Sequence, residues 1–268
     1  MLPLTRLGKT DLLISRLGLG TVKFGRNQAV KYPEAFELPS DELIRTLLHN
    51  ARDFGINLVD TAAAYGTSEE RLGYHLRHDR KQWVICSKAG ERFDGAESHF
   101  DFSPDALRKS LEYSLRRLRT DYLDILLIHS DGNDSNIIHR DQALHTLAQF
   151  KQEGWIRAYG MSTKTLEGAL TCAREADVVM TTFEQDSDDD LKVLNECLEH
   201  NTGVLLKKIF QNGNLLTAES HPQVPVLRIV GEKMASIFAH KAVNSAIIGT
   251  LNSQHLQSNV ACALEATL

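Results

Sequence analysis

Four side chains that can donate, accept or stabilise a proton lie at or shortly after the ends of apolar runs in this chain. The run NLVD ends in Asp60, WVICSK ends in Lys88 and DILLIH ends in His129, while Tyr65 lies five residues after Asp60. Such runs are typical of parallel strands buried on both faces, where a charged residue is unexpected for packing alone. Because the carboxyl ends of barrel strands open onto one face, we expect the four side chains to converge.

An acid, a phenol, an amine and an imidazole together suit proton transfer to a carbonyl oxygen. A phenol whose pKa is near 10 is a reluctant donor at neutral pH. The ammonium of Lys88 would stabilise the phenolate and lower the pKa of Tyr65, and Asp60 would keep that ammonium charged. His129 would hydrogen-bond the carbonyl oxygen and aim it at the phenol. These roles are coherent for a carbonyl reduced by hydride, with Tyr65 as the general acid.

Each of these residues also has a purely structural explanation. Asp60 could cap a turn, Tyr65 could belong to an ordinary loop, and His129 could be a hydrogen-bonded histidine of the core. Lys88 is harder to explain in this way, because a buried lysine needs a compensating partner such as Asp60. The combination, rather than any one member, therefore indicates a site.

The elements that would position these residues alternate between strand and helix. Ser40 and Ser103 are expected helix caps, the first followed by two acidic residues and the second by Pro104. Eight such units favour a closed (β/α)8 TIM barrel in one domain, residues 1–268, over an open sheet. The segments on either side of Gly8 would form an N-terminal β-hairpin that closes the barrel floor. Strands are expected at 17–21, 56–60, 83–88, 122–129, 155–161, 177–182, 203–208 and 245–249; helices are expected after Ser40, at 68–76, after Ser103, near 139–153, from 163, from 188, near 225–241 and after Asn252.

Composition limits the classes of function. With 268 residues and 42% hydrophobic content, the chain can bury a large core. Its net charge of −5 gives no sign of the positive surface that binds nucleic acid. Its apolar stretches are too short for a membrane span, and its first ten residues lack the apolar region of a signal peptide. The four cysteines are widely spaced, which predicts no metal site and favours a reducing cytoplasm. We expect a monomer or a weak homo-oligomer that acts on a small molecule.

Two other enzyme folds fit less well. A dinucleotide-binding Rossmann domain needs G-x-G-x-x-G between a strand and a helix, and LGLGTVKFG has its third glycine displaced. A metal-dependent barrel hydrolase would place two histidines at an early strand end. The segment LGLGT contains none, and His139 and His145 lie on a helical pattern.

Five stretches give the chain a close resemblance to the aldo-keto reductase family. They are LVDTAAAYGTSEERLG, ICSKAG, DYLDILLIHSD, WIRAYGMST and IIGTLNSQHLQSNV. The resemblance implies a barrel that binds NADP(H), occasionally NAD(H), and transfers hydride to an aldehyde or ketone. It also implies that the family's Asp, Tyr, Lys and His tetrad corresponds to Asp60, Tyr65, Lys88 and His129, in agreement with the roles given above.

The resemblance carries over less cleanly to the cofactor site. The family's Ser-Asn pair corresponds to Ser162 and Thr163, and its glutamine corresponds to Met180, which cannot make the same hydrogen bonds. Lys207 stands where an aromatic residue often stacks on nicotinamide. With Lys208 it could bind the pyrophosphate, or the two could be a solvated lysine pair.

The segment expected to hold the adenosine 2′-phosphate has Gly249 where many members have lysine and His255 where many have arginine. The remaining expected cofactor contacts are Thr21, Asp60, Phe210, Thr250, Leu251 and Asn259. The resulting hypothesis is a cytoplasmic carbonyl reductase that prefers NADP, with NAD possible. Two alternatives are an NAD-dependent aldose dehydrogenase and a cofactor-sensing binding protein with little turnover.

Overall fold

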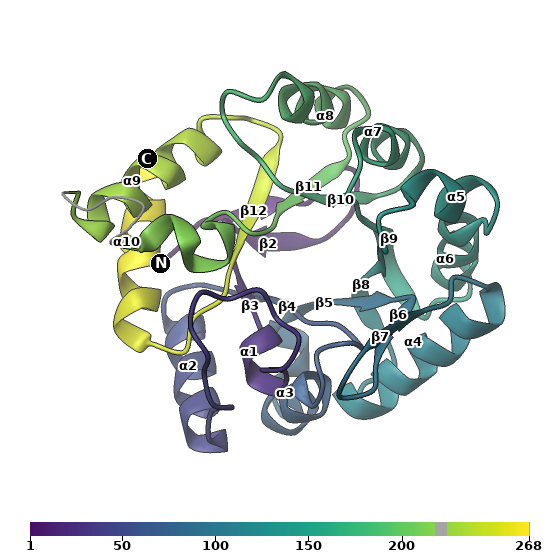
Figure 1. Ribbon diagram of the computed structural model, residues 1–268, viewed down its shortest axis with the longest axis horizontal. Helices are drawn as coiled ribbons and strands as arrows, with labels where there is room; N and C mark the ends of the chain where they lie inside the picture. Colours follow the sequence, from purple (N-terminus) through teal and green to yellow (C-terminus); the bar gives the residue numbers. More distant parts are fainter. Residues whose placement is uncertain (218–223, 268) are drawn as a thin grey trace.

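Eight parallel strands close into a barrel, which confirms the predicted (β/α)8 TIM barrel (Figure 1). The computed structural model describes residues 1–217 and 224–267. The barrel strands are β3 (Leu17–Gly20), β4 (Leu58–Asp60), β5 (Val84–Ala89), β8 (Leu123–His129), β9 (Ile156–Ser162), β10 (Val178–Thr181), β11 (Gly203–Leu206) and β12 (Val243–Ile248). They pair in chain order, and β12 pairs with β3 to complete the circle.

Helices surround this barrel and begin close to the predicted caps. The Ser40 side chain accepts a hydrogen bond from the Leu43 amide, and Ser103 accepts one from the Ala106 amide. These caps satisfy amide groups that have no partner within the helix. The longer helices are α2 (Asp41–Asp53), α3 (Ser68–Leu76), α4 (Pro104–Leu118), α6 (Ala143–Gln152), α7 (Leu166–Glu175), α8 (Asp188–Glu199), α9 (Val226–Phe238) and α10 (Ser253–Thr267). In the described part of the chain, no helix combines the length and apolarity that crossing a bilayer requires.

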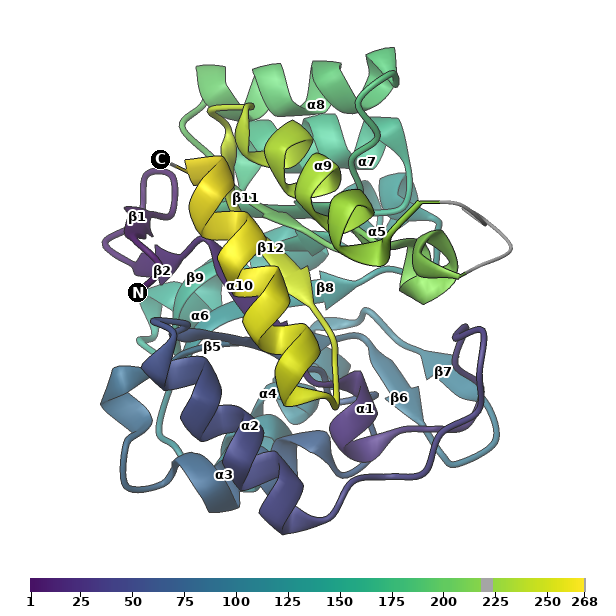
Figure 2. The same cartoon turned by 90° about the vertical axis from the view of Figure 1, so that its left-hand side faces the viewer.

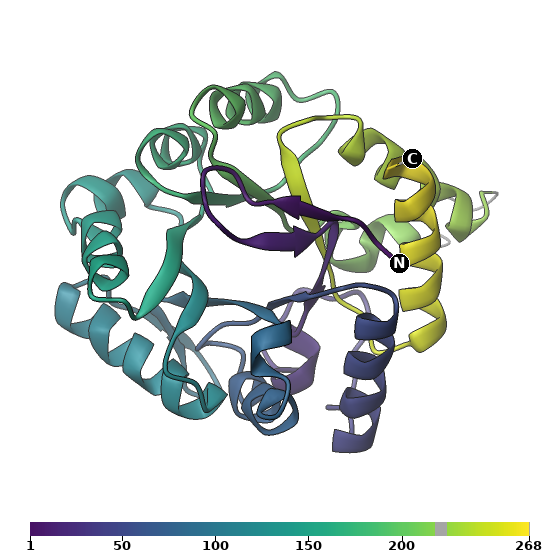
Figure 3. The same cartoon turned by 180° about the vertical axis from the view of Figure 1, so that it is seen from behind.

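The predicted N-terminal hairpin is also present. Strands β1 (Leu4–Arg6) and β2 (Leu13–Ser15) pair antiparallel across one end of the barrel (Figure 3). Leu7, Leu12 and Ile14 are buried in a cluster with side chains from the barrel interior. Gly8 has a positive φ of 50°, and a Cβ atom there would collide with the backbone of Gly203. Glycine is therefore required where the hairpin meets the barrel.

Two short strands and two short helices were not predicted from the sequence. A second hairpin, β6 (Glu91–Phe93) and β7 (Ser98–Phe100), follows β5 and lies at the opposite end of the barrel from β1 and β2 (Figure 2). A single turn, α1 (Val22–Gly25), follows β3, and α5 (Asp134–His139) follows β8. The helix predicted near 139–153 is consequently wrong at its start. Gln142 has a left-handed φ of 50° and separates α5 from α6.

Candidate active site

Lys88 and Asp60 form a buried ion pair at the barrel mouth. Lys88, on β5, is only 2% exposed, and its Nζ lies 2.5 Å from Asp60 Oδ1 at the end of β4. The same ammonium donates to the carbonyl oxygen of Thr61 at 2.9 Å. Burial disfavours the charge on Lys88, but Asp60, together with Tyr65 and Cys86, outweighs burial and raises the pKa of Lys88 above its usual value. The amine therefore stays charged, as predicted.

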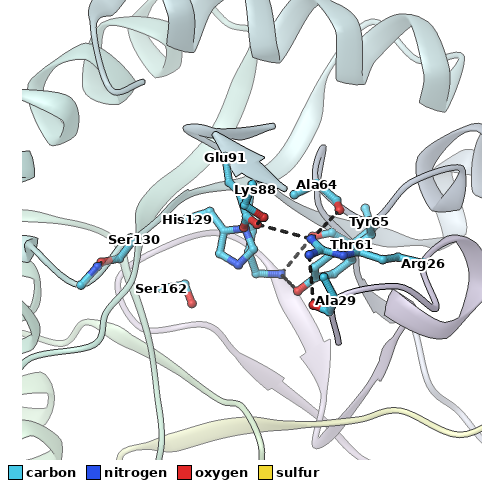
Figure 4. Close-up of polar contacts among 12 residues, drawn as sticks. Arg26, Ala29, Thr61, Ala64, Tyr65, Lys88, Glu91, His129, Ser130 and Ser162 are labelled. Carbon is cyan, nitrogen blue, oxygen red and sulfur yellow. Dashed lines mark hydrogen bonds and ion pairs between the residues drawn. The ribbon is translucent and has the colours of Figure 1, made fainter. Parts of the chain in front are cut away.

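Tyr65 meets this ion pair from the loop between β4 and α3. Lys88 Nζ lies 3.4 Å from the Tyr65 hydroxyl (Figure 4). A turn holds the tyrosine in place: its amide donates to the Ala62 carbonyl, and its carbonyl accepts from the Ser68 amide. The neighbouring Gly66 has a φ of 57°, and a Cβ atom there would strike the Gly25 carbonyl oxygen. The turn therefore requires glycine at that position.

The predicted lowering of the Tyr65 pKa is wrong as a net effect. Burial raises the pKa of Tyr65 to about 12; Lys88 lowers it and Asp60 raises it by smaller amounts. The stabilising influence of Lys88 on the phenolate is thus present, but it does not overcome desolvation. Tyr65 consequently carries its proton throughout the neutral range.

His129 completes the predicted set and has a partner that the sequence did not reveal. Its ring centroid lies 5.9 Å from that of Tyr65, with the two rings nearly perpendicular. Its Nδ1 lies 2.7 Å from Glu91 Oε2 on β6 (Figure 4). The contact is close, although its angle falls outside that of a well-formed hydrogen bond. Burial lowers the pKa of His129, and Glu91 opposes that shift.

Glu91 is itself held from two sides. Its Oε1 accepts a hydrogen bond from Ser98 Oγ at 2.5 Å and lies 3.4 Å from Arg26 Nη1. Burial works against its charge, but His129, Ser98 and Arg26 together lower the pKa of Glu91 to about 2. One sequence signal for this hairpin existed. Asp94-Gly95 lies between two short runs, which is typical of a hairpin turn.

The convergence of Asp60, Tyr65, Lys88 and His129 agrees with a comparison of the sequence with protein families. The family model described as the aldo/keto reductase family matches residues 16–225. The chain belongs to the aldo/keto reductase family. Members are oxidoreductases that use nicotinamide cofactors and act on small carbonyl compounds, and this coarse activity follows for the present chain.

Several aldo/keto reductases and related enzymes are similar to the chain. A solved structure from Pseudomonas aeruginosa, assigned as an aldo-keto reductase, has 43% sequence identity and a TM-score of 0.87, covering 99% of this chain and 95% of its own. L-galactose dehydrogenase from Arabidopsis thaliana is 28% identical over 98% of this chain and 88% of its own length. An NADH-specific methylglyoxal reductase from Escherichia coli is 34% identical over 58% of this chain and 50% of its own.

Three of the residues that the aldo/keto reductase resemblance assigned to the cofactor are in direct contact. Lys207, just after β11, donates from Nζ to Ser162 Oγ at 2.8 Å and to the Thr163 carbonyl oxygen at 2.7 Å. Burial, followed by the charges of Lys208 and Lys88, lowers the pKa of Lys207 to about 7. The alternative of a solvated lysine pair is therefore wrong for Lys207, whereas Lys208 is exposed.

Two other predicted cofactor contacts, Thr21 and Met180, are buried. Thr21 is fully buried, and its hydroxyl donates to the Asp60 carbonyl oxygen at 2.9 Å. Met180 is 1% exposed, its side chain lies in the interior cluster, and its carbonyl oxygen accepts from the Thr163 amide. Neither side chain presents appreciable surface to a ligand. Both therefore stay predictions as cofactor contacts.

The remaining predicted contacts lie along the connection from β12 to α10 and after β11. His255 is exposed in the first turn of α10, and its amide approaches Asn252 Oδ1 at 3.3 Å. Phe210 packs against the outer core. A cavity of about 400 Å³ lies between the ends of β9, β10 and β11 and helices α7 and α8, lined in part by Thr163, Lys207 and Lys208, and its described lining includes no residue of the β12–α10 connection. The other predicted cofactor contacts are Gly249, Thr250 and Leu251, which lie in the connection from β12 to α10, and Asn259, which is 8% exposed on α10.

Proposed function

We propose that this protein is an NADPH-preferring carbonyl reductase of the cytoplasm, which reduces a small aldehyde or ketone to an alcohol with Tyr65 as the general acid. The observation that carries the proposal is the Tyr65 hydroxyl 3.4 Å from the Lys88 ammonium, which Asp60 in turn keeps charged. A protonated phenol beside a fixed cation is suited to donate a proton and to tolerate the phenolate that results.

The side chains at the other side of the mouth fit a nicotinamide cofactor. Lys207 has three donor hydrogens, and two described acceptors, Ser162 and Thr163, account for two of them. Its remaining donor and the exposed Lys208 suit a carboxamide oxygen or a phosphate. We assign Ser162, Lys207, Lys208 and His255 to holding the cofactor. When bound, the cofactor supplies the hydride.

The chain's own residues then handle the proton. Tyr65 holds it until the carbonyl oxygen gains negative charge, because burial keeps the phenol protonated at neutral pH. Lys88 stabilises the phenolate that forms, and Asp60 prevents the lysine from losing its own proton. His129, whose ring meets the Tyr65 ring edge-on, orients the carbonyl oxygen toward the phenol.

The test is Tyr65→Phe, with Tyr113→Phe as the control because Tyr113 is exposed on α4. Loss of general acid catalysis should reduce kcat on a good aldehyde by about 10²- to 10⁴-fold. The Kd of NADPH and of NADH, measured by fluorescence titration, should stay near the wild-type values. A Tyr65→Phe protein that keeps wild-type kcat would show that another group donates the proton.

A second candidate is oxidation of an aldose with NAD by the same residues. Relatives named L-galactose dehydrogenase and D-threo-aldose 1-dehydrogenase favour it. Comparing turnover of an aldose with NAD and of an aldehyde with NADPH separates the two directions. Measurable turnover in either direction would also exclude a protein that only senses the cofactor.

A further inference from the structure

The contact between Glu91 and His129 determines which protons the imidazole carries. Glu91 Oε2 lies 2.7 Å from Nδ1, so an ionised carboxylate favours a proton on that nitrogen. Among the described residues, no hydrogen bond is made to the other ring nitrogen, Nε2. With Nδ1 protonated, a neutral ring can only accept at Nε2. It can donate there to a carbonyl oxygen only after gaining a second proton.

The charged groups around the ring oppose one another. Lys88 on β5 and Lys207 after β11 both disfavour a second proton on His129, as does burial. Glu91 on β6 acts in the opposite direction. Tyr65 also faces the ring, but it is neutral around pH 7. Glu91 is thus the group that offsets two nearby cations.

The carboxylate is fixed in place by its surroundings. Ser98, on the partner strand of the hairpin, donates to Glu91 Oε1, and Arg26 lies beside the same oxygen. Arg26 is in turn fixed, because its guanidinium donates to the carbonyl oxygen of Ala64 at 3.1 Å and stacks 3.6 Å from the Phe93 ring centroid. Figure 4 shows Arg26 and Glu91 on the side of the site away from Ser162.

We propose that Glu91 is a positioning residue for carbonyl reduction, which holds His129 with its proton on Nδ1 and allows Nε2 to gain the second proton that donates a hydrogen bond to the carbonyl oxygen. The proposal rests on the proposed function. In the reaction, hydride reaches the carbonyl carbon, the Tyr65 proton reaches the carbonyl oxygen, and His129 keeps both of its protons. Reduction should therefore become slower as pH rises through the pKa of His129.

The test compares Glu91→Gln with the wild-type protein. An opposite charge at this distance typically shifts a pKa by about 1 to 3 units, so the pKa of His129 in the variant should fall by about 1 unit or more. NMR titration of the His129 ring measures this directly, without cofactor or substrate. The alkaline limb of kcat/KM for aldehyde reduction should move to lower pH by the same amount, reducing the rate on that limb by about tenfold per unit.

Two further variants control the experiment. Glu91→Asp keeps the charge and should restore part of the His129 titration. Glu97→Gln removes an exposed carboxylate from the same hairpin and should change neither measurement. Arg26 keeps its backbone carbonyl partners in Glu91→Gln, so the variant should fold.

Three results would overturn the proposal. One is a His129 ring that titrates identically in the wild-type and Glu91→Gln proteins. Another is a uniform loss of rate at every pH with no displacement of the limb, which would mean that Glu91 is merely structural. The third is a Glu91→Asp ring that behaves no better than Glu91→Gln. If no variant, nor the wild type, reduces any carbonyl compound, the proposed function fails while the ring titration still decides the role of Glu91.

Discussion

Lys88 and Lys207 occupy opposite sides of the same barrel mouth, at the third and seventh barrel strands. Lys88 is buried and Lys207 is half-buried, and burial disfavours the charge on both. Lys88 has a carboxylate partner in Asp60, and its pKa is raised. Lys207 donates to a hydroxyl and a carbonyl oxygen, and its pKa is lowered to about 7.

The comparison shows that the partner, rather than burial, decides whether a lysine in this mouth stays charged. An amine beside a carboxylate is a permanent cation at physiological pH, which suits the stabilisation of a phenolate. An amine beside neutral oxygens gains or loses its proton near pH 7. We therefore expect Tyr65 and Lys88 to keep their protons across the neutral range, and Lys207 to gain or lose its proton there.

The largest effect should come from Lys88→Met. Removing the cation leaves Asp60 buried without its partner, which typically destabilises a protein by about 3–5 kcal/mol. Turnover at neutral pH should also fall by about 10²- to 10³-fold, because the phenolate loses its stabilising charge. Denaturant unfolding and kcat measure the two effects. Lys81→Met, at an exposed position, is the control, and equal behaviour of the two variants would remove Lys88 from the mechanism.

Asp60→Asn should turn Lys88 into a lysine that resembles Lys207. Without the carboxylate, desolvation should lower the pKa of Lys88 and make turnover depend on pH near neutrality, falling as pH rises. Because Asp60 acts through Lys88, the losses in Asp60→Asn and Lys88→Met should be strongly non-additive. A double-mutant cycle should give a coupling of about 1 kcal/mol or more. Simple additivity of the log rates would show that Asp60 does not act through Lys88.

Lys207→Met tests the other side of the mouth. A protonated Lys207 binds anionic or carbonyl oxygen groups more strongly than a neutral one, so cofactor affinity should weaken by about 5- to 10-fold as pH rises from about 6 to 8. The variant should bind both NADPH and NADH more weakly at pH 6 and show a flatter pH dependence. Fluorescence titration across that range measures it, with exposed Lys109→Met as the control. Unchanged affinity at pH 6 would place the cofactor away from Lys207.

The smallest effect is expected for His255→Arg, which tests the adenosine end of the cofactor separately from the nicotinamide end. His255 is exposed, and a side chain that binds only the 2′-phosphate should affect NADPH and leave NADH alone. Arginine stays charged and offers a bidentate fork. The variant should therefore bind NADPH more tightly at pH 8 by about 5-fold, on the scale of one charged hydrogen bond. An equal change for both cofactors would contradict this assignment.

Most of the candidate catalytic residues could be predicted from local sequence patterns. Apolar runs of strand length that end in Asp60, Lys88 and His129 are visible in the sequence, and the barrel brings their ends together. The capping serines of α2 and α4 were equally readable, because a cap acts on amides within the next few residues. These features depend on near neighbours in sequence and on a regular fold.

The features that were missed depend on long-range contacts. Arg26 and Glu91 are 65 residues apart, and neither lies at a strand end that the alternation marks. Lys207 follows a predicted strand, but its pKa depends on burial first, and then on the adjacent Lys208 and on Lys88, which is distant in sequence. The net rise of the Tyr65 pKa reflects how completely the fold desolvates the phenol, which a motif does not specify.

The β1–β2 hairpin has a consequence for the order of events at the site. Its side chains fill one end of the barrel, and the β6–β7 hairpin, whose Glu91 contacts His129, lies at the other end. Ligands therefore have to reach the catalytic residues from the end of the barrel opposite the β1–β2 hairpin. Where one ligand lies beneath another, the deeper ligand has to bind first and leave last.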